Sequence, residues 1–336
     1  EILISAVTSQ LKVIILGYKS YTATVVLLQL YMEATGFLYL YDKWECISLV
    51  DINSVLFIYS TGLTNVAMMI LILFNIGCLH FIQSSMKTAM FKPKSKAQVE
   101  NARKWKSVAH SFQKLFFGNN ILLNIAVVVM GICKDEDLIL VAHKPSFLQR
   151  NAFVAFQAAM CIYNAQMCAT YVSLITSLLI EIIIQLSLLE KTLETMKDGE
   201  GIRKCVEWHL QILVFAEKVQ RFCGLGVSVV LLCGIINICT SFSLLMEVGG
   251  VELLFLLPYL VEIIMIIYSH CWCGSELLYQ SGKISSAIYS SQWTTADVSH
   301  KKKINIYMLM TQKPLQIYLW GDHQVSLFCF HYTPEI

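Results

Sequence analysis

Long apolar runs separated by short polar stretches dominate this sequence. Four runs contain no Lys, Arg, Asp or Glu and cover residues 52–86, 115–133, 151–180 and 222–246. Two more contain a single carboxylate each: residues 20–41 contain Glu33, and residues 253–275 contain Glu262. A helix that crosses the hydrocarbon core of a bilayer needs about 20 mostly apolar residues. The pattern therefore predicts six membrane-spanning helices, and a seventh among the residues after Lys303.

We expect an all-α membrane protein with seven transmembrane helices, in which residues 1–336 form a single domain. The expected spans cover residues 20–42, 53–84, 113–133, 152–181, 222–247, 252–275 and 314–334. Apolar residues continue at helical spacing after the fourth span, and again after the turn MKDGEG, which predicts two long helices that leave the membrane and pack as a hairpin. This hairpin is either a stalk within one subunit or an interface between subunits.

The composition agrees with a membrane protein, because 56% of the residues are hydrophobic, 14% are charged and the mean hydropathy is +0.61. The basic residues then predict the orientation. Of the 25 Lys and Arg residues, 21 lie before the first span or in the second, fourth and sixth connections. Since cytoplasmic loops carry the excess of Lys and Arg, we expect a cytoplasmic N-terminus. A G-protein-coupled receptor has the opposite orientation.

Motifs of enzymes and metal sites are missing from the sequence. It contains no GxSxG, HExxH or GxxxxGK[ST] pattern, so we expect neither catalysis nor a cofactor. Cys271 and Cys273 flank a tryptophan without a second pair of ligands at metal-binding spacing, so we expect no metal site. Among the twelve cysteines, Cys46 and Cys133 lie near connections where a single disulfide could form.

Two carboxylates fall inside expected spans. Glu33 and Glu262 each cost several kcal/mol in a bilayer unless they face protein or water, or are protonated. Each residue either pairs with a polar neighbour on an adjacent helix or forms a proton or ion site. The second alternative would make the protein a multi-span transporter.

The fourth span carries a stripe of large residues. Phe156, Met160, Tyr163 and Met167 recur at steps of four, three and four, so they lie on one side of the helix. Aromatic and thioether groups can line an apolar pocket, and a tyrosine hydroxyl supplies an oriented polar contact. The same stripe would also serve helix packing. Weaker candidates for a pocket in the outer halves of other spans are Tyr59, Val127, Met130, Phe255 and Tyr259.

The last third of the chain resembles the C-terminal signature of insect odorant receptors. The run GSELLYQSGKISSAIYSSQW is followed by a basic stretch, MTQKPLQIYLWG and VSLFCF, and CVEWHLQILVFAEKVQRF lies upstream. The residues that fit the signature are Thr311, Gln312, Lys313, Pro314, Leu315, Gly321, Ser326, Leu327 and Phe330. The resemblance covers roughly the last 135 residues. Gustatory receptors, the nearest relatives of this family, end differently and provide an alternative assignment.

The resemblance implies a function. Members of this family are seven-helix subunits with a cytoplasmic N-terminus, and they form tetrameric ligand-gated cation channels. A tuning receptor, as this chain would be, assembles with a common odorant co-receptor in the plasma membrane of the olfactory sensory neuron dendrite. Volatile odorants and membrane lipid are the other implied partners. Nucleic acid is not an implied partner. Cytoplasmic helices, here residues 182–221 and 276–313, would form an anchor domain.

The resemblance also implies where ligand and ions bind. Ligands of the family bind in the outer halves of helices two, three, four and six, which favours a pocket at the Phe156 stripe. The final helix lines the pore, and here it would present Leu319, His323, Ser326 and Phe330.

The junction between anchor and pore would be Gln312, Lys313 and Pro314, because proline interrupts a helix and the lysine can stay at the cytoplasmic surface. The family's final helix continues beyond the VSLFCF position through an aromatic-rich segment, whereas this sequence ends at HYTPEI, so we expect a shortened C-terminus. The start without Met indicates a fragment.

Overall fold

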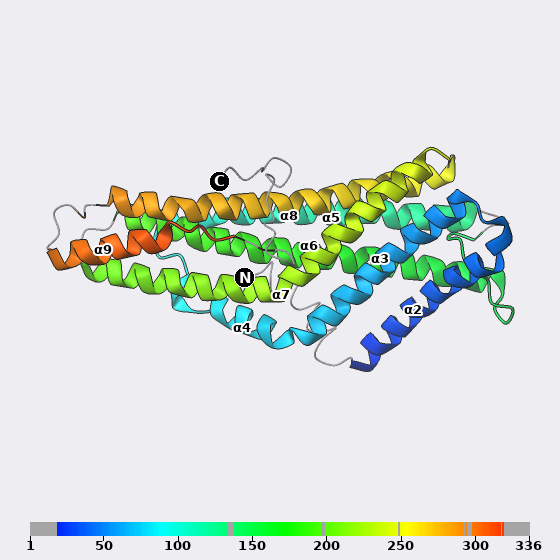
Figure 1. The fold of residues 1–336 in the computed structure, drawn as a ribbon, viewed down its shortest axis with the longest axis horizontal. Coiled ribbons are helices and arrows are strands. Elements are labelled where there is room, and N and C mark those ends of the chain that lie inside the picture. The colour runs from blue at the N-terminus through cyan, green and yellow to red at the C-terminus, as the bar shows by residue number, and fades with distance from the viewer. Residues whose placement is uncertain are drawn as a thin grey trace. The chain divides into compact units, whose positions relative to one another are not determined.

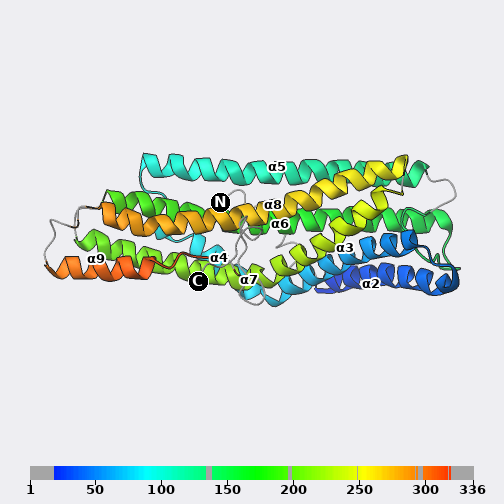
Figure 2. The same ribbon diagram turned by 45° about the horizontal axis from the view of Figure 1, so that its top comes forward.

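The protein is described by a computed structural model that covers residues 19–133, 138–195, 199–247, 249–291, 293, 298–316 and 318. These residues are almost entirely helical (Figures 1 and 2). In chain order the elements are α2 (Lys19–Asp42), η1 (Trp44–Cys46), α3 (Leu49–Phe74), α4 (Ile76–Met86), η2 (Ala89–Phe91), α5 (Lys96–Cys133), α6 (Arg150–Glu194), α7 (Gly199–Leu245), α8 (Val251–Ser290) and α9 (Val298–Thr311).

Six helices are long and apolar enough to cross a membrane: α2, α3, α5, α6, α7 and α8. They correspond in order to the first six predicted spans, so the all-helical membrane fold is confirmed. The second span was predicted as one helix over residues 53–84, but α3 ends at Phe74 and α4 begins at Ile76. Asn75 separates them with φ −105° and ψ 19°. Asparagine favours such breaks because its side chain competes for backbone hydrogen bonds in non-helical conformations.

The third spanning helix begins earlier than predicted. The basic connection after α4 was expected to reach residue 113, yet α5 starts at Lys96. A capping box explains this start, because the Gln98 amide donates to Ser95 Oγ at 3.1 Å while Ser95 N donates to Gln98 Oε1 at 3.3 Å. These reciprocal bonds satisfy backbone donors that a helix start leaves unpaired. The sequence Ser-Lys-Ala-Gln carried this signal.

The predicted anchor segments are helical over most of their described length. The hairpin consists of the end of α6, which stops at Glu194, and the start of α7 at Gly199. Residues 276–313 were predicted as one anchor segment and form two helices, because α8 ends at Ser290 and α9 covers Val298–Thr311. The cytoplasmic location of these helices stays a prediction.

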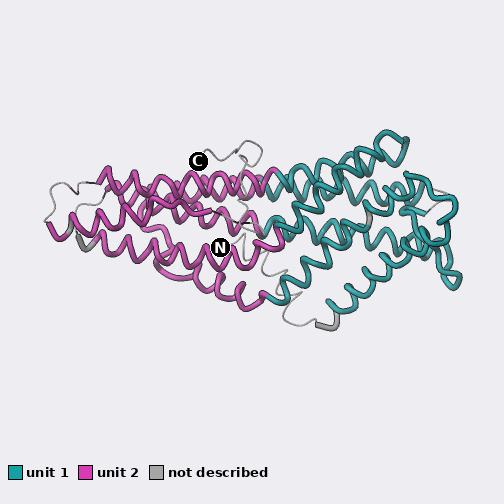
Figure 3. The backbone as a smooth tube through the Cα atoms, in the orientation of Figure 1, with its two compact units in different colours: residues 1–74, 112–174, 228–267 teal, residues 75–111, 175–227, 268–336 magenta. Residues whose placement is uncertain are grey.

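The chain divides into two compact units, which Figure 3 colours separately. Unit 1 comprises residues 1–74, 112–174 and 228–267, and unit 2 comprises residues 75–111, 175–227 and 268–336. Helices α5, α6, α7 and α8 each contribute residues to both units.

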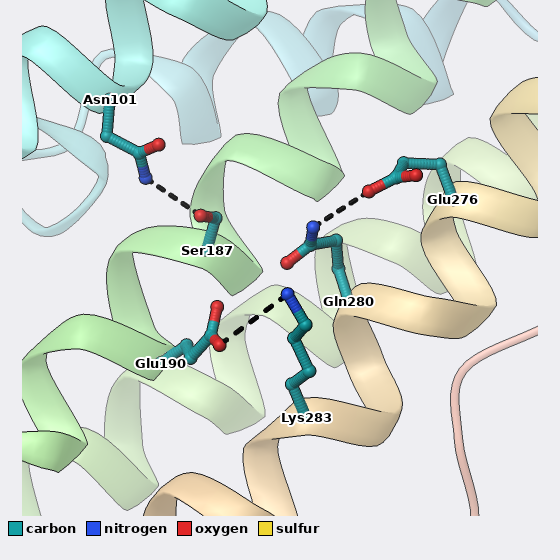
Figure 4. Close-up of polar contacts among 6 residues, drawn as sticks. All are labelled: Asn101, Ser187, Glu190, Glu276, Gln280 and Lys283. Carbon is teal, nitrogen blue, oxygen red and sulfur yellow. Dashed lines mark hydrogen bonds and ion pairs between the residues drawn. The ribbon is translucent and has the colours of Figure 1, made fainter.

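The core of unit 2 is built around the second half of α6. Leu178, Ile183 and Leu186 are fully buried, as expected for a helix that is apolar on all sides and surrounded by neighbours. Polar bonds connect this part of α6 with other helices of the unit (Figure 4). Asn101 Nδ2 of α5 donates to Ser187 Oγ at 2.7 Å, and Lys283 Nζ of α8 lies 3.9 Å from Glu190 Oε1.

Candidate ligand-binding site

Unit 1 contains a cavity of about 110 Å³ that α2, α3, α5, α6, α7 and α8 line. Its walls are mostly apolar, and their large side chains include Met32, Phe57, Leu123, Met160, Phe255 and Tyr259. A single buried water needs about 10–15 Å³, so the cavity is several times larger than a site for one water. A mostly apolar cavity with a few polar groups is typical of sites for small organic molecules.

Three aromatic rings form one wall of the cavity. The centroid of the Tyr259 ring lies 4.3 Å from that of Phe57 and 5.9 Å from that of Phe255. Phe57 belongs to a buried cluster with Leu244 and Leu256. The Tyr259 hydroxyl is hydrogen-bonded to Thr61 Oγ1. This wall can pack against an apolar or aromatic ligand without leaving the tyrosine hydroxyl unpaired.

A connecting segment also reaches the cavity. The fully buried side chain of Gln157 in α6 makes two bonds to the backbone of Leu140: Oε1 accepts from the amide at 3.3 Å, and Nε2 donates to the carbonyl at 3.1 Å. Leu140 therefore forms part of the lining. Gln157 was not among the predicted site residues, because an isolated glutamine near the start of a span gives no local signal for such a contact.

Within the part of the chain that the structure describes, Glu262 of α8 is the only carboxylate in the lining. Asn119 of α5 donates through Nδ2 to Glu262 Oε2 at 2.6 Å and to the Pro258 carbonyl at 3.0 Å. Glu33, the other intramembrane carboxylate, accepts a hydrogen bond of 2.7 Å from Gln29 on its own helix. Each carboxylate thus has a polar neighbour. The neighbour of Glu262 lies on an adjacent helix, whereas the neighbour of Glu33 lies on the same helix.

Four of the nine predicted ligand-binding residues line the cavity: Val127, Met160, Phe255 and Tyr259. The other five lie outside the lining, and they are Tyr59, Met130, Phe156, Tyr163 and Met167. Tyr59 accepts a hydrogen bond from the Phe37 amide at 2.5 Å, and Met130 is buried.

Most residues of the predicted stripe on α6 pack against other side chains, and one lines the cavity. Phe156 pairs with the rings of Tyr31 and Phe153. Tyr163 and Met167 pack with Val25 and Met69 in a separate cluster. The only stripe residue in the lining is Met160.

A neighbouring side of α6 faces the cavity. The α6 residues that line it together with Met160 are Cys161, Asn164, Ala165 and Cys168. These side chains are smaller than those of the predicted stripe. Large side chains fill the space between helices, so space remains where residues are small. The spacing of small residues at 161, 164, 165 and 168 was the signal that could have predicted this surface.

The predicted junction near the end of the chain is partly described. Helix α9 ends at Thr311, and Gln312, Lys313 and Pro314 follow in non-helical conformations. The predicted pore-lining residues Leu319, His323, Ser326 and Phe330 lie outside the described residues, as does most of the expected seventh span.

The cysteines and possible metal ligands among the described residues form neither of two sites considered from the sequence. Cys46 and Cys133 are free thiols and exposed, so the disulfide considered from the sequence is not formed. The described part of the chain contains no group of His, Cys, Asp or Glu side chains arranged to hold a metal ion.

The fold resembles solved olfactory receptor structures. OR5 from Machilis hrabei aligns with a TM-score of 0.75 over 93% of this chain and 85% of that chain. Its complex with eugenol aligns with a TM-score of 0.79 over 92% of this chain and 84% of that chain. Sequence identity is 16% in both cases, so these similarities establish the fold.

Sequence comparisons identify the family. Odorant receptor 10 of Aedes albopictus is 25% identical over 44% of this chain, and Odorant receptor 46a, isoform B, of Drosophila melanogaster is 26% identical over 46%. The matches span less than half of these relatives, 42% and 43% of their lengths. The family model described as 7tm Odorant receptor matches residues 48–333. Because this match covers most of the sequence, the chain belongs to the insect odorant receptor family, a family of receptors and not of enzymes.

Proposed function

We propose that this protein is an odorant receptor subunit that binds small volatile organic ligands and forms a ligand-gated cation channel with the odorant co-receptor. The apolar cavity in unit 1 is the observation that carries the proposal. It offers apolar burial from six helices, an aromatic wall around Tyr259 and a few amide and hydroxyl groups. Such a site selects ligands by shape, with orientation from the polar groups.

The proposal includes the orientation and assembly of the subunit. The distribution of 21 of the 25 basic residues supports a cytoplasmic N-terminus. Residues 182–221 and 276–313 would then lie in the cytoplasm and form the anchor of a hetero-tetramer with the co-receptor. On this proposal the subunit is a tuning receptor in the plasma membrane of an olfactory sensory neuron dendrite, surrounded by lipid.

The proposed pore belongs to residues 314–334, with Leu319, His323, Ser326 and Phe330 facing the ions. Gln312, Lys313 and Pro314 would connect this segment to the anchor. A ligand opens a channel only if it binds one of two conformations more tightly than the other. The cavity residues of α5 to α8 belong to helices that also contribute residues to unit 2. In the proposed mechanism these helices transmit the effect of ligand binding to the anchor.

Odorant-evoked current is the direct test. The full chain is expressed in cells with and without the odorant co-receptor, and a broad panel of odorants is applied. We expect cation current that requires both chains. Substrate uptake that depends on Glu33 or Glu262, without odorant-evoked current, would instead support the transporter alternative.

A pair of cavity variants assigns the binding site. Val127 lines the cavity and is 2% exposed, whereas its neighbour Val128 on α5 is 48% exposed. Val127→Phe adds a ring to the cavity, so we expect its half-maximal odorant concentration to rise about tenfold or more. Val128→Phe should leave the response unchanged. Overpacking also costs about 1–3 kcal/mol of stability, so surface delivery of both variants is measured in parallel. Equal responses would remove the cavity from the proposal.

A further inference from the structure

The lining of the cavity contains a carboxylate, Glu262. An apolar odorant does not need such a charged group for binding. Among the described residues of the lining, Glu262 is the only Asp or Glu, and no Lys, Arg or His accompanies it. Its side chain is 6% exposed. Oε2 accepts the hydrogen bond from Asn119, whereas Oε1 is buried and has no hydrogen-bond partner among the described residues. A buried carboxylate requires compensation by donors or by a positive charge.

Amide oxygens in the same lining are also unpaired. Gln29 Oε1, Asn65 Oδ1, Asn124 Oδ1 and Asn164 Oδ1 are buried and have no hydrogen-bond partner among the described residues. The terminal torsions of these side chains are broad, so small rotations can turn an oxygen towards a ligand. The described residues thus offer these acceptors no donor, and a ligand that donates hydrogen bonds would satisfy them.

A ligand with several donors and no acceptor fits this arrangement. A primary ammonium group has three N–H donors and a positive charge. One N–H can bond Glu262 Oε1 and the others can bond amide oxygens, while the attached apolar body packs on the ring wall of Phe57, Phe255 and Tyr259. A hydroxyl supplies one donor and no charge, so it would satisfy fewer of these atoms.

We infer that the cavity takes a small apolar or aromatic molecule that ends in a primary amine, bound as the ammonium ion with Glu262 as its counter-ion. The inference rests on the proposed odorant-binding function and specifies its ligand class. It assigns Glu262 as the residue that separates amines from neutral molecules of the same shape.

Three ligands of equal size test the inference. Phenethylamine, 2-phenylethanol and propylbenzene share a phenyl ring and have the same number of heavy atoms, but end in an amine, a hydroxyl and a methyl group. Currents are recorded from the full chain with its co-receptor. We expect phenethylamine to act at a concentration at least about tenfold below that of the other two, as a desolvated charge pair implies.

The variant Glu262→Gln keeps the shape of the side chain and removes its charge. We expect it to raise the half-maximal concentration for phenethylamine about tenfold or more, and to move those of other active ligands far less. Glu33→Gln is the matched control, because Glu33 is a buried carboxylate of the same unit outside the cavity lining, and a glutamine there can still accept the hydrogen bond from Gln29. Surface delivery of both variants is measured, and the ligand series on the unmodified chain decides the question if a variant is not delivered.

The outcomes separate the inference from the proposed function. Current in response to neutral odorants but not to amines overturns the inference and leaves the odorant receptor function intact. An unchanged phenethylamine response in a delivered Glu262→Gln variant overturns it as well. Absence of current for every odorant in a broad panel overturns both.

Discussion

The side-chain amide of Gln220 in α7 makes hydrogen bonds to both backbone groups of Tyr318. The Tyr318 amide donates to Gln220 Oε1 at 3.2 Å, and Gln220 Nε2 donates to the Tyr318 carbonyl. Ser281 of α8 holds the same segment, because the Leu315 amide donates to its hydroxyl at 2.9 Å. Side chains of two helices in unit 2 therefore fix the chain just after Pro314, where the proline has removed a backbone donor.

Removing the Gln220 amide should loosen this segment. In Gln220→Leu, the Tyr318 backbone loses two partners, and each lost hydrogen bond is worth about 0.5–1.5 kcal/mol. We expect amide exchange at residues 315–318 to become several-fold faster in a hydrogen-exchange measurement. Gln211→Leu, at an exposed position of the same helix, should leave exchange there unchanged. Equal rates in both variants would show that the two bonds do not hold the segment.

Local sequence predicted one part of this junction and missed another. The proline predicted that the preceding helix ends at the junction of Gln312, Lys313 and Pro314, and α9 ends at Thr311. A new helix was expected to begin near Leu315, but Leu315, Gln316 and Tyr318 are not helical. The bonds to Gln220 and Ser281 come from residues far away in the sequence. Hydrophobic periodicity contains no information about such tertiary partners.

Gly62 of α3 allows the Gln29 and Glu33 side chains of α2 to pack against the α3 backbone. A methyl group at this position would overlap the Glu33 carboxylate and the Gln29 amide. Gly62→Ala displaces these two buried side chains, and this overpacking should outweigh the helix-propensity gain of alanine, so we expect stability to fall by about 1 kcal/mol. Thermal unfolding of the purified protein measures the change.

Gly118 of α5 provides the control for this variant. A methyl group there meets nothing within 4 Å, so Gly118→Ala adds only helix propensity. We expect it to raise stability by up to about 1 kcal/mol. If both alanine variants have the same unfolding temperature, close packing at Gly62 is not important for stability.

The cavity shows how far periodicity could identify the candidate site. Apolar spacing correctly gave the spanning helices, because a membrane helix must be apolar over its full length. It did not give the side of α6 that lines the cavity, where Asn164 and Cys168 lie, because both packing and pocket surfaces contain apolar residues. Only the relative rotation of neighbouring helices decides between them, and that depends on contacts such as Tyr163 with Met69.

Tyr307 of α9 has a buried hydroxyl without a hydrogen-bond partner among the described residues. Its ring, 4% exposed, meets the His209 ring of α7 at a centroid distance of 5.7 Å. Tyr307→Phe keeps the ring contact and removes the unsatisfied hydroxyl. We expect stability to rise by about 1 kcal/mol, measured as the unfolding temperature at neutral pH. Tyr289→Phe, at a 68% exposed position, should have no effect.

Tyr307→Phe should also change how the unfolding temperature depends on pH in the alkaline range. Burial raises the pKa of Tyr307 above its ordinary value of 10, so the folded protein retains a proton that the unfolded chain releases. Below pH 10 the hydroxyl is neutral in both states, and above pH 10 its ionisation in the unfolded chain lowers the free energy of unfolding progressively. Unfolding temperatures from pH 9 to pH 11 should therefore fall less steeply in Tyr307→Phe than in the unmodified chain. Parallel curves would show that the Tyr307 hydroxyl does not control this loss.

The ion pair between Glu190 of α6 and Lys283 of α8 should stabilise unit 2 modestly (Figure 4). The side chains are 17% and 33% exposed, so solvent screens the pair less than the exposed pair of Arg203 and Glu207. A double-mutant cycle with Glu190→Gln and Lys283→Met should give a coupling of about 0.5–1 kcal/mol, against about 0.3 kcal/mol or less for Arg203 with Glu207.

The two single variants of this pair should differ. Lys283→Met leaves the more buried carboxylate without its counter-ion, so it should cost more stability than Glu190→Gln, which leaves the more exposed ammonium. Unfolding temperatures measure both costs, and added salt should reduce the coupling of the exposed pair more than that of the Glu190 pair. Equal costs and equal salt dependence would mean that water screens the Glu190 pair as fully as a surface pair.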